Sequence, residues 1–226
     1  MGYEDENVEP CVLDLETAAR DGIDELLDVP SAPANYKDPA KILDAKLEKL
    51  KTLIERAALD INLNRIVAFG VWTPSQGVRV VIAKNEDEER GHLAALGLFI
   101  RNSGHRRRIV NFNGLSFDLM VCVRRAQLLG VTDFPALDIT PAWRSPHTDL
   151  MEVLTFGGKV AKHSLDFYCR VFGIDAEELD DVKLVSGADI PRLVKEERWD
   201  LIEGHCRYDV TLTMLLAKRL RVINEA

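Results

Sequence analysis

Apolar and polar residues follow two different periods along this chain, and the period separates strands from helices. Around residues 11–16, apolar positions alternate with Asp14 and Glu16, which is the two-residue period of a strand. A turn that contains Pro74 and Gly77 separates two longer apolar runs and predicts a β-hairpin. The predicted strands are 11–16, 65–72, 78–83, 109–112 and 145–150.

Helical spacing of apolar residues dominates the stretches between and after these strands. Residues 18–37 contain Gly and Pro without a clear period, which predicts an extended loop. Because strands joined by a hairpin precede strands that alternate with helices, we expect an α/β domain with a mixed β-sheet flanked by helices. The helices predicted in these stretches are about 86–102, one that follows the Asn113-Gly114 turn and runs to about 129, 150–157, 164–172, 189–196 and 199–222.

A further helix is predicted to begin at Asp38, which caps its N-terminus, with Pro39 in the first turn. Its apolar stripe suggests that it covers a sheet, whereas its many basic residues suggest a place near a nucleic-acid strand. We favour the first interpretation, because the polar face of a helix is normally just solvated. The stripe is Leu43, Leu47, Leu50 and Ile54, and the basic residues are Lys41, Lys46, Lys49, Lys51 and Arg56.

Composition places the 226-residue chain among globular proteins, with 46% hydrophobic and 29% charged residues. No apolar run approaches the roughly 18 residues that span a bilayer. The acidic N-terminal segment lacks the basic and apolar regions of a signal peptide, so we expect a cytoplasmic protein with no membrane partner. The cysteines are widely spaced, which predicts buried or half-buried thiols in a reducing compartment and not a disulfide or zinc framework. They are Cys11, Cys122, Cys169 and Cys206.

The formal net charge of −8 argues against a broad surface that coats nucleic acid. It still allows an enzyme that holds a few nucleotides in one cleft. A cluster of metal-binding carboxylates would also make the formal charge misleading, because bound cations offset it.

Asp14 and Glu16 are the first candidates for such a cluster. Their spacing on a strand puts both carboxylates on one face and Leu13 and Leu15 on the other. Two adjacent acids repel each other, and a divalent cation such as Mg²⁺ removes the repulsion because it prefers oxygen ligands. Taken alone, such a pair is more often a solvated strand end, since a chain with 37 acidic residues contains such pairs by chance.

Asp118 is the second candidate, because Asn113-Gly114 makes a turn after a strand and Asp118 then lies in the first turn of a helix. Ligands of open α/β sheets collect outside the carboxyl ends of strands. A favourable acid near a helix N-terminus is the simpler alternative.

His205 and Asp209 form the third motif. Their spacing of four residues puts them on one face of the last predicted helix, while Tyr208 points about 100° away from Asp209 and is a poorer candidate. A surface histidine is the simpler alternative for His205.

Together, these three motifs resemble those of the DnaQ-like (DEDD) 3′–5′ exonucleases, which have an RNase H-like fold. The chain looks closest to the branch related to the proofreading domain of family B DNA polymerases. The segment 31–60 resembles a helical insertion in phage-encoded members. The resemblance runs through nearly the whole chain and includes His147-Thr148-Asp149-Leu150-Met151, Ser164-Leu165-Asp166-Phe167, Lys183 with Ser186-Gly187, and Cys206-x-x-Asp209-Val210.

The resemblance implies one exonuclease domain over residues 1–226, free-standing because no polymerase domain fits in this length. It implies two Mg²⁺ or Mn²⁺ ions, held by Asp14, Glu16, Asp118 and Asp209, that promote hydrolysis of a terminal phosphodiester. The chain departs from this branch at His205, where relatives carry Tyr four residues before the last Asp. A neutral imidazole can accept a proton near pH 7, so we expect His205 to be a catalytic base or to position water.

Substrate contacts are predicted at Thr17, Asn113, Phe117 and Lys183. Asn113 is expected to position the substrate or the loop, and Phe117 to stack on a base or to pack in the core. Loop residues Lys159, Lys162 and His163 can reach phosphates or be merely exposed.

Arg101 and the run His105-Arg106-Arg107-Arg108 are the most basic part of the chain. They precede the strand whose far end carries Asn113, and a strand of about five residues spans roughly 17 Å. We therefore expect them at the opposite end of the strand from the site, facing solvent.

The sequence thus predicts hydrolysis of single-stranded or frayed DNA 3′ ends, with a DNA polymerase or replication protein as a possible partner. A ribonuclease of the same superfamily that trims short RNA is an alternative, because the choice of sugar depends on contacts to the 2′-OH. A degenerate exonuclease fold that only binds nucleic acid or a polymerase is another, and the intact set of four carboxylates argues against it.

Overall fold

A five-stranded mixed sheet organises the part of the chain that the computed structural model describes, residues 9–101, 108–139, 144–174 and 185–223. The order is β3-β2-β1-β4-β5, in which β1, β2 and β3 are antiparallel and β1, β4 and β5 are parallel. The mixed sheet and the hairpin are as predicted. The strands are β1 (Cys11–Ala19), β2 (Asn64–Thr73), β3 (Gly77–Ile82), β4 (Ile109–Asn111) and β5 (Thr148–Asp149).

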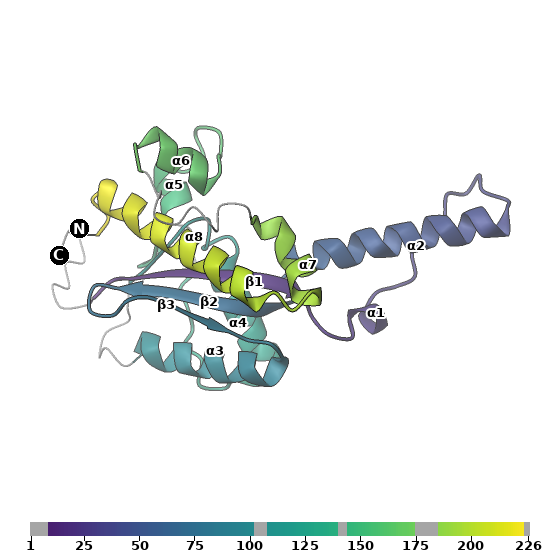
Figure 1. The fold of residues 1–226 in the computed structure, drawn as a ribbon, viewed down its shortest axis with the longest axis horizontal. Coiled ribbons are helices and arrows are strands. Elements are labelled where there is room, and N and C mark those ends of the chain that lie inside the picture. The colour runs from purple at the N-terminus through teal and green to yellow at the C-terminus, as the bar shows by residue number, and fades with distance from the viewer. Residues whose placement is uncertain (1–8, 102–107, 140–143, 175–184, 224–226) are drawn as a thin grey trace.

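Helices cover both faces of this sheet (Figure 1). On one face α8 (Trp199–Arg219) crosses β1, β2 and β3, and on the other lie α3 (Glu86–Arg101) and α4 (Asp118–Leu128). The alternation along β1 sends Leu13 and Leu15 into the core with α3 and α4, and Val12 into the core with α8. Among the described residues, no helix has both the length and the apolar content to cross a membrane. The smaller elements are α1 (Ile23–Leu26), η1 (Ala57–Leu59), α5 (Leu150–Leu154), α6 (Leu165–Val171), η3 (Gly187–Asp189) and α7 (Ile190–Lys195).

Gly70 on β2 lets α8 come close to the sheet. A Cβ atom there would lie 2.5 Å from Val210 Cγ2 and 2.7 Å from Cys206 Sγ, closer than any ordinary contact. Gly70 is the register partner of Asp14 on β1. The missing side chain therefore allows the middle of α8 to approach the strand that carries the first acidic pair.

A buried ion pair fixes α4 against α3. Arg125 is fully buried and donates to both carboxylate oxygens of Glu89, each at 2.7 Å. Glu89 Oε1 also accepts the backbone N–H of Ile66 at 2.8 Å. Because every charge in this group has a partner, the helix whose first residue is Asp118 has a defined position.

Some predicted boundaries were wrong by several residues. The strand predicted at 11–16 continues to Ala19, and the predicted loop 18–37 contains the short helix α1. The strand predicted at 145–150 comprises Thr148–Asp149 alone, since Asp149 already caps α5. The helix predicted at 189–196 starts as the 3₁₀ turn η3 and continues as α7.

The helix α2 (Pro39–Arg56) does not cover the sheet, and this corrects the favoured interpretation of its apolar stripe. It extends away from the sheet in Figure 1, and none of its residues, all of which are described, is buried. The exposed fraction is 58% for Leu43 and 54% for Leu47. The start was predicted correctly, because Asp38 accepts the N–H of Ala40 at 2.9 Å. The described residues leave the outer part of the stripe, with Leu43 and Leu47, uncovered.

Candidate active site

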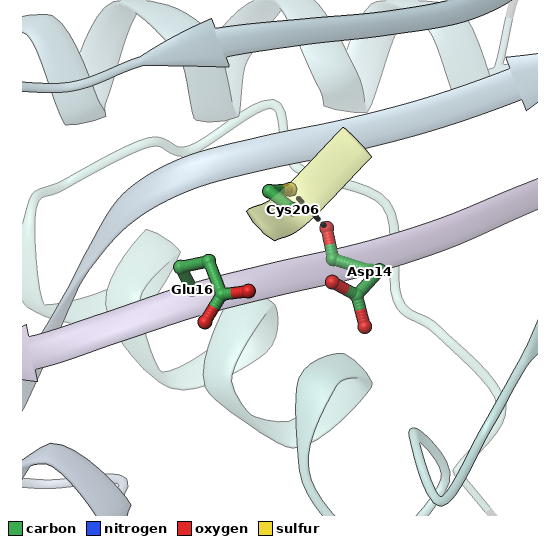
Figure 2. Close-up of side chains that lie close together, drawn as sticks. All are labelled: Asp14, Glu16 and Cys206. Carbon is green, nitrogen blue, oxygen red and sulfur yellow. Dashed lines mark hydrogen bonds between the residues drawn. The ribbon is translucent and has the colours of Figure 1, made fainter. Parts of the chain in front are cut away.

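The two acids of β1 lie next to each other as the strand period predicts. Figure 2 shows the side chains of Asp14 and Glu16 together, with Cys206 of α8 beside them. One carboxylate oxygen of each acid and the Sγ atom of Cys206 all lie within 4.8 Å of one another. Glu16 is buried and Asp14 half-buried. This close approach brings a strand and a helix together around one small acidic volume.

Asp118 reaches the same strand from α4. Its Oδ1 atom accepts the backbone N–H of Leu15 at 3.0 Å. The ladder between β1 and β4 pairs Cys11 and Val12 with Ile109 and Val110, so the N–H of Leu15 lies beyond those pairs and bonds to this carboxylate instead. Asp118 therefore contacts β1 at the residue that separates the two acids, beyond the carboxyl end of β4.

His205 and Asp209 complete the group from α8, and both face Glu16 as their spacing predicts. His205 Nε2 lies 3.6 Å from Glu16 Oε1 and 3.8 Å from Asp209 Oδ2. These three side chains form a second set whose ligand atoms are within 4.8 Å of one another. Glu16 belongs to both sets, so it connects the Asp14 side of the site with the His205 side.

Burial, together with repulsion from neighbouring acids, raises the pKa values of all four carboxylates. Desolvation is the main cause for Asp14 and Glu16, whose pKa values lie well above their ordinary range, and the charges of Asp209 and Asp118 add to it. Desolvation raises the pKa of Asp118 to about 7, although the backbone N–H of Leu15 opposes the shift. Desolvation and the charge of Asp166 raise the pKa of Asp209 to about 7.

The pKa of the His205 imidazole is shifted in the opposite direction, downward. Burial lowers its pKa, against the charges of Asp166 and Asp189, which raise it. Its Nδ1 atom is buried and has no hydrogen-bond partner among the described residues. The ring is therefore mainly neutral at pH 7, with Nε2 directed at the carboxylates.

These residues fit a divalent cation. The Oδ2 atom of Asp14 is buried and has no hydrogen-bond partner within the described ranges. Hard cations bind carboxylate oxygens, and their charge stabilises the ionised form of acids that otherwise repel each other. Asp14, Glu16, Asp118 and Asp209 are the residues that could hold such ions.

The turn at Asn113 is built by Asp149, which the sequence analysis named only within a motif of the resemblance and gave no role. Asn113 has a left-handed backbone with φ 63°, and its N–H donates to Asp149 Oδ1 at 2.7 Å. The same carboxylate accepts the N–H of Leu115 at 3.1 Å and of Met151 at 2.9 Å. The sequence signal available for this role was the position of Asp149, an acid where a predicted short strand meets a predicted helix. Asp149 therefore positions the loop that leads to Asp118.

The other predicted substrate contacts have different surroundings. The hydroxyl of Thr17 donates to the carbonyl of Ala58 at 2.7 Å, and Thr17 is buried. Phe117 is partly buried and packs against the core with α3 and α4, which is the alternative left open for it. Lys183 lies outside the described residues, so its predicted role, like those of Thr17 and Asn113, stays a prediction.

The basic run lies mostly outside the described residues as well. Arg108 is described, and its guanidinium donates to the carbonyl of Val222 near the end of the described chain. Burial lowers the pKa of Arg108. Arg101 is exposed at the end of α3, and it and Arg108 flank residues 102–107.

Cys206 and Gly70 are the remaining features that sequence reasoning missed at the site. All four cysteines are buried as predicted, but the position of Cys206 beside Asp14 follows from the packing of α8. A glycine inside an otherwise apolar strand was the available signal, because it often marks a close approach of another backbone.

Comparison with known protein families agrees with this geometry. The family described as a predicted 3′–5′ exonuclease related to the exonuclease domain of PolB matches residues 57–226. The chain belongs to this family. The resemblance to DnaQ-like exonucleases of the family B polymerase branch is thereby confirmed, and the chain is a predicted 3′–5′ exonuclease. No curated protein matched the chain.

Among solved structures, the chain is similar to the family B DNA polymerase from the hyperthermophilic archaeon Pyrobaculum calidifontis. The TM-score is 0.61 at 16% sequence identity, and the match covers 95% of this chain and 24% of the polymerase. The chain therefore spans about a quarter of the length of that polymerase. At this identity the similarity confirms the RNase H-like fold.

Proposed function

We propose that this chain hydrolyses the terminal phosphodiester at the 3′ end of single-stranded or frayed DNA and releases nucleoside monophosphates. The observation that supports it is the convergence of Asp14, Glu16, Asp118 and Asp209 from a strand and two helices on one buried volume. Four acids with raised pKa values in one place destabilise a protein unless something binds them.

The carboxylates hold two Mg²⁺ or Mn²⁺ ions in this proposal. When bound, such ions make water more acidic and stabilise the leaving 3′ oxygen. Asp14 would contribute the oxygen that has no partner in the described structure, and Glu16 lies close to both Asp14 and Asp209. Asp118 and Asp209 would supply the remaining carboxylates from the two helices.

His205 accepts the proton of the attacking water or orients that water. Its Nε2 atom lies beside Glu16 and Asp209, and burial keeps the ring neutral at pH 7. A neutral imidazole is the form that accepts a proton. This assigns a base to the position where related proteins carry a tyrosine.

A gel assay with 5′-labelled DNA and RNA of the same sequence tests the proposal in Mg²⁺, in Mn²⁺ and in excess EDTA. We expect metal-dependent shortening of the DNA and none in EDTA. Faster shortening of the RNA would favour the ribonuclease alternative. Binding of either strand without any cleavage in both metals would favour the binding module, and cleavage at full rate in EDTA would exclude the two-metal mechanism.

A further inference from the structure

The apolar stripe of α2 has the spacing of a coiled-coil seam. Leu43, Leu47, Leu50 and Ile54 follow one another at intervals of four, three and four residues, and Ala40 precedes Leu43 by three. This alternation is the pattern by which the apolar side of one helix packs against that of another helix. The spacing therefore favours a second helix, and not a sheet, as the surface that covers the stripe.

The stripe is accessible to another chain. Leu43 and Leu47 are exposed, and Leu50 is half-buried. The loop before α2 contacts the helix at Lys49, which donates to the carbonyl of Ser31, and a side chain at this position points about 100° away from that of its neighbour Leu50. The loop therefore lies beside the stripe and leaves its leucines open, and exposed apolar groups that gather on one face mark an interaction surface.

The charges beside the stripe are complementary to those of a second copy of the same helix. Asp44 and Lys51 each follow a leucine of the stripe by one residue, so both lie on the same flank, and both are exposed. A two-fold axis across the middle of the stripe places Asp44 of each copy opposite Lys51 of the other, which forms two ion pairs. Lys51 Nζ is 4.0 Å from Glu55 Oε1 on its own helix, an exposed pair that leaves the ammonium open to a second acid.

The same charges select an antiparallel pair over a parallel one. In a parallel pair, Lys46 of one helix would face Lys51 of the other, and like charges at these positions repel. α2 also extends away from the sheet, so parallel helices would bring both protein bodies to the same end (Figure 1). Antiparallel helices separate the bodies by most of the length of an 18-residue helix, about 27 Å.

We propose that α2 is a dimerisation arm, through which two copies of this chain pair their helices antiparallel. Leu43 then packs on Ile54 of the second copy and Leu47 on its Leu50, and the two-fold axis repeats both contacts. Because the helix offers only about two heptads, we expect association at micromolar protein, so that dilute enzyme is monomeric. The inference goes beyond the proposed function, since the interface contains none of the carboxylates of the candidate site.

Sedimentation velocity on the full chain over a series of micromolar concentrations, without DNA or metal, tests the proposal. The mass of the wild-type chain should rise from 25.4 kDa towards twice that value. Leu47→Glu should weaken association by at least about 10-fold, because a charge would be buried in the pair, and Glu still favours a helix. The matched control is Leu98→Glu on α3, where the leucine is 49% exposed, and it should associate like the wild type.

A charge exchange tests the orientation without touching the stripe. Asp44→Lys and Lys51→Glu should each weaken association by about 5-fold or more, because each replaces two attractive contacts per dimer with repulsive ones. The double variant should recover most of the loss, since the ion pairs form again with their signs exchanged. Stronger association of Lys51→Glu alone would mean a parallel pair and would contradict the proposed orientation. Circular dichroism of each variant verifies that α2 remains helical.

Two results would overturn the dimerisation arm. The first is a wild-type chain that remains at 25.4 kDa at every concentration. The second is a Leu47→Glu variant that associates like the wild type, and if this variant instead binds labelled DNA more weakly, α2 is a nucleic-acid contact. Neither result bears on cleavage, because the mass is measured without substrate, so the proposed function stands or falls separately.

Discussion

The helices α2 and α8 both have apolar residues at helical spacing, yet they lie in opposite environments. Nine residues of α8 are buried, and none of α2. α8 packs on three strands and approaches β2 closely at Gly70, where no side chain intervenes. α2 extends from the body, and its Lys49 donates to the carbonyl of Ser31 in the preceding loop at 2.7 Å.

The difference shows that helical periodicity predicts a helix but not the surface that covers it. An amphipathic helix is buried only where another element offers a complementary shape. The two helices also differ in their relation to the candidate active site. The buried helix α8 brings His205 and Asp209 to the acids of β1, whereas the acids of α2 are solvated. Changes on α8 should therefore affect catalysis and stability far more than equivalent changes on α2.

The largest effect should come from removing a carboxylate on the α8 side of the site. Asp209→Ala should lower the cleavage rate by at least about 10⁴-fold, because the proposed two-metal site would lose one of its ligands. Asp44→Ala on α2 is the matched control and should cleave DNA at the wild-type rate. Rates from a labelled-DNA assay, with melting curves to verify folding, measure both. An Asp209→Ala variant that remains active would break the assignment of α8 to the site.

His205→Ala should lower the rate by about 10²–10⁴, the usual range for a positioned general base. The wild-type rate should fall as pH drops, because protonation removes the basic nitrogen. Since burial lowers the pKa of His205, this acid limb should lie below the ordinary value of 6.5. His205→Tyr should recover part of the loss and shift the limb. An unchanged rate and an unchanged pH profile in His205→Ala would mean that the carboxylates act alone.

The close approach at Gly70 can be tested by filling it. Gly70→Ala places a Cβ atom 2.5 Å from Val210, so α8 must move, and we expect a loss of about 1–3 kcal/mol in the free energy of unfolding and slower cleavage. The matched change Leu47→Ala on α2 should cost less than about 0.5 kcal/mol, because the side chain is already exposed. Urea unfolding measures both, and equal losses would contradict the comparison.

A smaller effect is expected on the stability of the metal-free protein. The pKa values of Asp118 and Asp209 are raised to about 7 in the folded state, above those of the unfolded chain. Their protonated forms favour folding, so this contribution is present below about pH 4 and is lost as pH rises through about 7. In EDTA the melting temperature should therefore fall between pH 5.5 and 8, and Mn²⁺ should restore it. Asp209→Asn should flatten the pH dependence.

The parts of the fold and the site that the sequence predicts are local ones. The period of β1 places Asp14 and Glu16 together, and the spacing in α8 places His205 and Asp209 on one face. Asp118 at the start of α4 follows from a turn signal. Each depends on residues within one element, where geometry is set by the backbone alone.

The parts that the sequence did not predict depend on contacts between distant segments. Gly70 meets Cys206 only after α8 has packed on the sheet, and Asp149 binds backbone groups of a turn 34 to 36 residues earlier. Phe112, just after β4, packs edge-on against Tyr168 of α6. The exposed position of α2 was not predictable either, because the pattern of a buried helix and that of an uncovered one are the same.

The direction of degradation tests the central claim most directly. A single-stranded DNA labelled at its 5′ end is incubated with the wild-type chain and Mn²⁺, and samples are taken over time on a denaturing gel. The account predicts a ladder of labelled products that shorten step by step, with unlabelled nucleoside monophosphates released. Immediate release of a labelled mononucleotide without a ladder would show attack from the 5′ end and would contradict the account.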